Sequence, residues 1–96
     1  MRQHMAELRD RLASTPAEVV VANHAYGLFE LAALHLSLER PQLAEARLAI
    51  DALGYLVDGL GDRLGEPAAE LQAALAQLRL AFVQVQAAQP PPPPSG

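Results

Sequence analysis

The sequence contains no cysteine, no lysine and no tryptophan, and aromatic residues make up only 4% of its 96 residues. Without cysteine the chain cannot form disulfides, thiolate metal sites or a thiol nucleophile. With so few aromatic residues, the core must consist mainly of leucine, alanine and valine. That composition suits close helix packing better than an aromatic-lined ligand pocket, and it disfavours a small-molecule enzyme.

The charge of the chain is mildly acidic, and its basic residues are scattered. Seven arginines stand against eleven carboxylates, which gives a formal net charge of -4. No basic block is present to release counterions from a phosphate backbone, so nucleic acid is not expected as a partner. The first eleven residues mix charged and apolar side chains and lack the continuous apolar stretch of a secretion signal, so we expect a cytoplasmic protein.

Apolar residues recur with helical spacing along most of the chain, which predicts an all-α fold. A short opening helix over 4–13 carries Met5, Leu8 and Leu12 on one stripe. Three main helices over 16–38, 41–61 and 67–88 complete a single domain of residues 1–89. The segment 90–96, with its run of prolines, is expected to be a disordered tail.

The boundaries of the second helix carry specific signals. Thr15, Pro16 and Glu18 match a capping box, in which the hydroxyl caps the helix, proline occupies its first position and the glutamate reaches back. At the other end Glu39 and Arg40 precede Pro41, which disfavours helical geometry before it and can open the next helix. The link is short, so the second and third helices should run antiparallel.

The second helix is apolar around its whole circumference, and such a helix must be buried on every side. A chain of this length is too short to enclose it alone, so we predict self-association, as a homodimer or a higher oligomer, through this helix. Although the segment approaches the length of a bilayer span, its polar residues would be costly in lipid, and no membrane partner is expected. The predicted interface consists of Val20, Asn23, His24, Gly27, Leu28, Glu30, Leu31, Leu34 and His35.

Three polar residues on this helix are the candidates for chemistry. His24 and His35 share a face but are about 16 Å apart along the axis, too far to hold one metal ion. We expect His24 to be a histidine buried in the bundle, and Glu30 to pair with Arg47 or Arg79 if enclosed. No metal-binding pair, phosphate loop or nucleophile with a base is present, so we expect no catalytic residue, no metal and no cofactor, and the chain is not expected to be an enzyme.

The third and fourth helices each carry an apolar seam with alternating steps of three and four residues. The third seam contains Leu43, Ala46, Ile50, Leu53, Val57, Leu60 and Leu64, and the fourth contains Leu71, Leu75, Leu78, Phe82 and Val85. Gly54 lies within the third helix and permits a close backbone approach, while Gly59 and Gly61 weaken the end of this helix. We expect a helix-pairing network of Arg47, Asp51, Arg79 and Phe82.

Two runs of residues resemble a known family. The run from Ala46 to Leu53 reads ARLAIDAL, and the run from Leu75 to Phe82 reads LAQLRLAF. In this order and spacing they resemble small, actinobacterial-type bacterial proteins of domain of unknown function family 1844, over 15–86. The resemblance implies a helical, cytoplasmic bacterial protein with no assigned activity, cofactor or catalytic residue. The chain departs from the family's usual pattern in the very short link at 39–41 and in its proline-only tail.

The functional expectation that follows is a non-enzymatic oligomerisation or interaction module whose partner is a second copy of itself. One alternative is an accessory subunit whose apolar second helix docks on a different protein. Another is a binding or sensing protein that holds a hydrophobic ligand or a metal ion near His24, Glu30 and His35.

Overall fold

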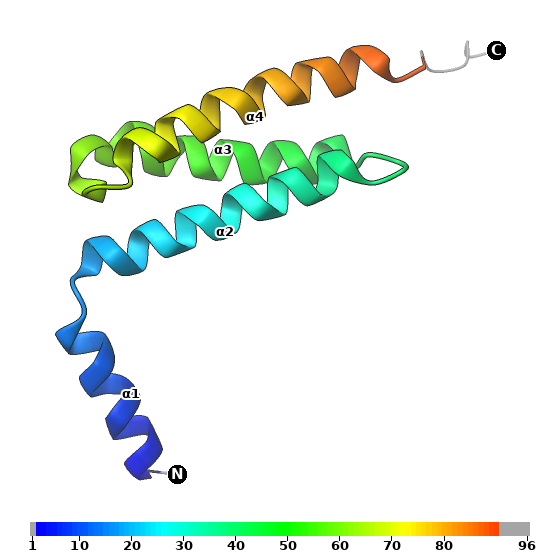
Figure 1. Cartoon of the computed structure of the whole chain (residues 1–96). Coiled ribbons are helices and arrows are strands. Elements are labelled where there is room, and N and C mark those ends of the chain that lie inside the picture. The colour runs from blue at the N-terminus through cyan, green and yellow to red at the C-terminus, as the bar shows by residue number, and fades with distance from the viewer. Residues whose placement is uncertain (1, 91–96) are drawn as a thin grey trace.

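The computed structural model describes residues 2–90 and is all-α (Figure 1). Its helices are α1 (Arg2–Ser14), α2 (Ala17–Ser37), α3 (Leu43–Leu60) and α4 (Ala68–Ala88), and a short 3-10 helix, η1 (Gly61–Leu64), connects α3 to α4. The predicted fold class is therefore confirmed. Residues 91–96 of the predicted tail lie outside the described residues, as does Met1.

The bundle itself consists of α2, α3 and α4, and α3 runs antiparallel to the other two helices (Figure 1). Its core is built from the seams that the sequence predicts. Leu53, Val57, Leu64 and Leu71 are the largest fully buried side chains, and the other seam positions of α3 and α4 are buried or half-buried. No polar or charged side chain is buried between residues 2 and 90. Burial of leucine, valine and alanine is thus the main source of stability.

The third helix begins two residues later than predicted. Pro41 lies before it, and Gln42 is its cap. The Gln42 N–H donates to the carbonyl oxygen of His35 at 3.0 Å, which holds the connection against the end of α2. Gln42 has a non-helical conformation, with a φ of -103° and a ψ of 84°, so α3 becomes helical only from Leu43. At its other end α3 stops at Leu60, and Gly61 follows with a positive φ of 52°.

The capping box predicted for α2 is wrong. The hydroxyl of Thr15 donates to the carbonyl oxygen of Arg11 at 2.7 Å, and the Thr15 N–H donates to the same oxygen at 3.1 Å. Thr15 therefore closes the C-terminus of α1, and α2 has no side-chain cap at its N-terminus. The Glu18 carboxylate lies against Gly65, where a Cβ atom would be 2.9 Å from its Oε2.

Helix α1 stands outside the bundle (Figure 1). It buries none of its residues and touches no other helix of the described chain. The side chains of its apolar stripe are exposed, Met5 at 59%, Leu8 at 41% and Leu12 at 63%. The packed part of the predicted domain therefore begins only at α2.

Candidate interaction site

The outer face of α2 lies opposite the face that packs on α3 and α4, and it is open. Ala22, Ala25, Ala32 and Leu36 on the inner face are buried. On the outer face Leu31 remains 44% exposed and Leu34 remains 53% exposed. The nine residues predicted for the interface lie on this face or along its edges: Asn23, His24, Gly27, Glu30, Leu31 and Leu34 are exposed, and Val20, Leu28 and His35 are half-buried. The bundle thus covers one side of an apolar helix and leaves the other uncovered.

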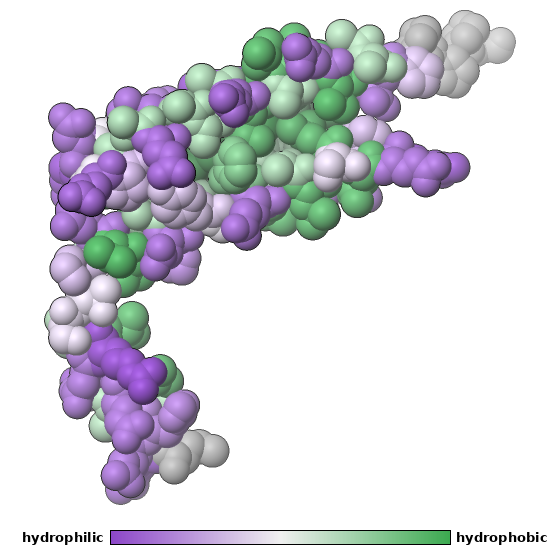
Figure 2. All heavy atoms as spheres, in the orientation of Figure 1, coloured by the Kyte–Doolittle hydropathy of each residue, from purple (hydrophilic) through white to green (hydrophobic). Residues whose placement is uncertain are grey.

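Helix α2 is also the helix, within residues 2–90, whose length and composition would allow it to cross a membrane. Its inner face is packed against two helices of its own chain. Figure 2 shows apolar side chains along the C-terminal halves of α2 and α4 on the visible side of the molecule. Exposed apolar side chains therefore lie on α4, at Leu80 and Val83, as well as on α2.

The prediction that His24 is buried in the bundle is wrong, because His24 is exposed. Glu30 is exposed too, so the enclosure that its pairing with Arg47 or Arg79 required is not present among the described residues. Arg47 instead lies 3.9 Å from Asp51, and Arg79 lies 3.3 Å from Asp58. Both arginines therefore pair with carboxylates of α3.

His35 differs from the other polar residues of α2. Its ring is half-buried, and its Nδ1 atom is buried without a hydrogen-bond partner among the described residues. An enclosed polar atom without a partner is destabilising, because it has lost its water and gained nothing in return. The described residues bring together no three histidine, aspartate or glutamate side chains that could hold a metal ion.

The predicted helix-pairing residues Arg47, Asp51, Arg79 and Phe82 are brought together on one groove. This groove lies between α3 and α4 and encloses about 320 Å³. Gly54 is buried beneath it, and a Cβ atom there would be 2.7 Å from Nη2 of Arg79. The close backbone approach expected at Gly54 is therefore not what the structure shows, because the atom that comes nearest belongs to the Arg79 side chain. Both ion pairs at the groove are more than half exposed, so each contributes little to stability.

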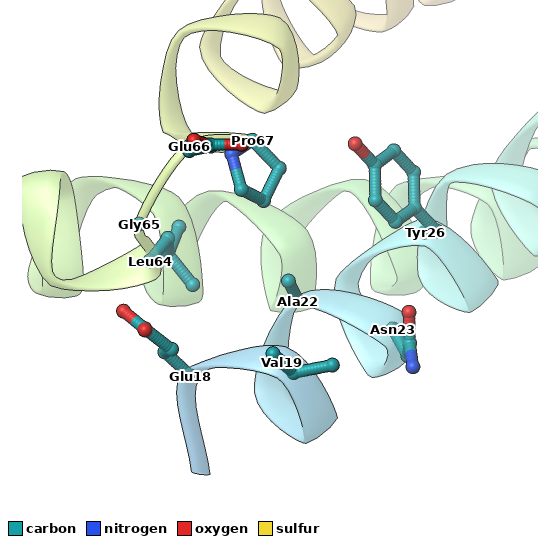
Figure 3. A pocket seen from close by; sticks show the side chains of 9 residues that line it. All are labelled: Glu18, Val19, Ala22, Asn23, Tyr26, Leu64, Gly65, Glu66 and Pro67. Carbon is teal, nitrogen blue, oxygen red and sulfur yellow. The ribbon is translucent and has the colours of Figure 1, made fainter. Parts of the chain in front are cut away.

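A second opening, which we call the Tyr26 cavity, lies where α2 meets the turn between η1 and α4 (Figure 3). It encloses about 430 Å³. Its apolar lining comes from Val19, Ala22, Leu64 and Pro67, with the ring of Tyr26 at one end. The carboxylates of Glu18 and Glu66 stand at its rim. Such a cavity suits an apolar group that carries positive charge beside it.

Tyr26 connects α2 to α4 at the edge of this cavity. Its hydroxyl donates to Oε2 of Glu70 at 2.9 Å. This hydrogen bond raises the pKa of Tyr26 above its ordinary value, with smaller contributions from desolvation and from the charge of Glu70. Neither the cavity nor the bond could be predicted from local sequence patterns, because Tyr26 and Glu70 are separated by 44 positions along the chain. A tyrosine among alanine and valine on the second helix is the only local signal of either.

The comparisons with known proteins yield no relatives. No protein-family model, no curated protein and no solved structure matches the chain significantly. The similarity to family 1844 therefore stays a prediction, and the functional argument depends on the surface of this chain.

Proposed function

We propose that the protein is a non-enzymatic self-association module and that the outer face of α2 is its interface. The observation that carries this proposal is the partial exposure of Leu31 and Leu34 on a helix whose opposite face is buried. Completing the burial of each leucine would contribute about 1 kcal/mol. Two such faces packed against each other would bury four leucines.

The middle of this face is suited to a helix–helix contact. Gly27 lies there, and no atom lies within 4 Å of the place where its Cβ would be. A glycine at such a point allows a second helix backbone to approach closely. The polar edges, with Asn23 and Glu30 on one side and His24 on the other, would form the rim around an apolar centre. Because the same face is present on every copy, a twofold arrangement is the simplest closed assembly.

The test is the mass of the full chain in solution, measured by light scattering over a range of concentrations. We expect a mass of at least twice the 10.2 kDa of one chain at micromolar concentration. Leu34→Glu should weaken this association about tenfold or more, because a carboxylate would enter an apolar contact. Leu48→Glu is the matched control, since Leu48 is 70% exposed on α3 and lies outside the proposed interface. A sharp monomer mass for the unaltered chain would overturn the proposal.

A further inference from the structure

We propose that α1 is an exchanged arm, whose apolar stripe occupies the Tyr26 cavity of a second copy of the chain. This inference rests on the proposed self-association and names a second contact within it. It begins with α1, a helix of 13 residues that buries none of them. Isolated helices of this length are marginal in water, so α1 needs a surface to pack on.

The stripe of α1 has a basic border. Met5, Leu8 and Leu12 follow one another at helical spacing, and Figure 2 shows apolar atoms on α1 that no other part of the described chain covers. Arg2 and Arg9 project along one edge of the stripe, and His4 and Arg11 project along the other. The two carboxylates of α1, Glu7 and Asp10, lie toward the opposite side of the helix.

The charge of α1 is opposite to that of the rest of the chain. With three arginines and two carboxylates, α1 has a formal charge of +1. Since the net charge of the whole chain is -4, the rest of the chain has a formal charge of -5. The Tyr26 cavity has an apolar lining and two glutamates at its rim, Glu18 and Glu66. An apolar stripe bordered by arginines and an apolar cavity bordered by glutamates are complementary in both respects.

The cavity is large enough for side chains of the arm. A cavity of about 150 Å³ accommodates a group the size of benzene. The 430 Å³ of the Tyr26 cavity therefore leaves room for two side chains of the stripe. Leu8 and Leu12 are one helical turn apart and can enter it together. Val19, which is 44% exposed at the cavity, would be covered by the same contact.

The link between α1 and α2 favours a second copy over the arm's own bundle. Thr15 donates two hydrogen bonds to the Arg11 carbonyl, and Pro16 holds φ at -56° with an extended ψ of 136°. The bonds close α1 at Thr15, the extended ψ of Pro16 separates it from α2, and α1 points away from its own bundle (Figure 1). Folding α1 back would require the backbone to rotate at Thr15 or Pro16, the two residues that separate α1 from α2. Exchange of identical arms between two copies needs no such change and creates two equal contacts.

The experiment uses two full-length variants that disable opposite halves of the contact. Leu8→Glu places a carboxylate on the arm, facing the acidic rim, and Val19→Glu places one in the cavity. Each variant alone should associate at least about tenfold more weakly than the unaltered chain. When the two variants are mixed in equal amounts, the intact arm of the Val19→Glu variant can bind the intact cavity of the Leu8→Glu variant. Association should then recover in part, with one of the two contacts restored.

Ala6→Glu, which adds the same charge to α1 away from the stripe, is the control for the arm. Leu80→Glu, at a residue 59% exposed on α4 and outside the cavity, is the control for the bundle. The inference is overturned, while self-association stands, if Leu34→Glu weakens association but Leu8→Glu and Val19→Glu behave like their controls. Failure of the mixture to recover also overturns it. If the unaltered chain is monomeric, both proposals fail, and binding of that monomer to anionic vesicles through Leu8 would identify α1 as a membrane-surface helix.

Discussion

The sharpest test of the packing between α3 and α4 is Gly54→Ala. Gly54 lies within α3 and is buried, and a Cβ atom there would be 2.7 Å from Nη2 of Arg79 and 3.9 Å from Cδ1 of Leu75. The second distance is an ordinary contact, so Arg79 alone must move. The atom concerned is the end of a flexible side chain that is 54% exposed, and it can turn toward solvent.

Two opposing effects determine the result. Replacing glycine by alanine within a helix stabilises it by about 1 kcal/mol. Movement of the Arg79 guanidinium breaks its 3.3 Å ion pair with Asp58. Because both side chains are more than half exposed, this pair contributes at most about 0.5 kcal/mol to the free energy of unfolding. We therefore expect Gly54→Ala to raise the free energy of unfolding by about 0.5 kcal/mol, or the melting temperature by about 2–4 °C for a domain of this size.

The assay is urea denaturation followed by circular dichroism, at one fixed protein concentration because association also affects stability. Asp58→Asn provides the second arm of a double-mutant cycle. In that background the ion pair is already absent, so Gly54→Ala should stabilise by the full amount of about 1 kcal/mol. Destabilisation by Gly54→Ala in both backgrounds would refute the reasoning, because it would mean that the space over Gly54 cannot open by movement of Arg79.

Three further predictions concern other parts of the bundle. His35→Leu should raise the free energy of unfolding by about 1 kcal/mol in urea denaturation, since it removes an enclosed nitrogen without a partner; a loss of stability would reveal a partner for that nitrogen. Leu53→Ala should lower the free energy of unfolding by about 3 kcal/mol, because Leu53 is completely buried. A decrease of less than about 1 kcal/mol would contradict the burial of Leu53 in the core. Glu70→Gln should lower the pKa of Tyr26 in a spectrophotometric titration, since Glu70 is the main cause of its increase. A raised pKa favours the neutral phenol in the folded state. The stabilisation from Tyr26 is therefore present below the ordinary tyrosine pKa of 10.0 and is lost as the pH rises through the raised value. If Tyr26→Phe loses the same amount of stability over that pH range, Tyr26 is not the group responsible.

Patterns within about two helical turns were predicted well. The seam from Leu43 to Leu64 and the seam from Leu71 to Val85 are buried or half-buried as expected. The end of α3 before Asp62 follows from the same kind of local argument. These predictions succeed because helical periodicity places such residues on one side of a helix whatever that side faces.

Predictions about individual polar groups were less successful, because they depend on competing partners. The hydroxyl of Thr15 was expected at the start of α2 but is bonded to Arg11 in the preceding helix. Glu30 was expected to meet Arg47 or Arg79 if it was enclosed, but it is exposed, and both arginines pair with carboxylates of α3. In each case the group that was expected to bond, the Thr15 hydroxyl or the arginine, has a closer partner, and only the packed arrangement of the helices determines which partner is closer.

The sequence by itself determined that this chain is helical, where its main helices lie and which seams close the core, because these follow from the spacing of apolar side chains along a single element. Only the tertiary structure decided that α3 and α4 cover one side of α2 and leave the other open. It also decided that α1 stands away from the bundle, and that Tyr26 meets Glu70 beside an acidic-rimmed cavity. Those features arise where separate helices meet, and the angle and distance between helices depend on all of their contacts at once.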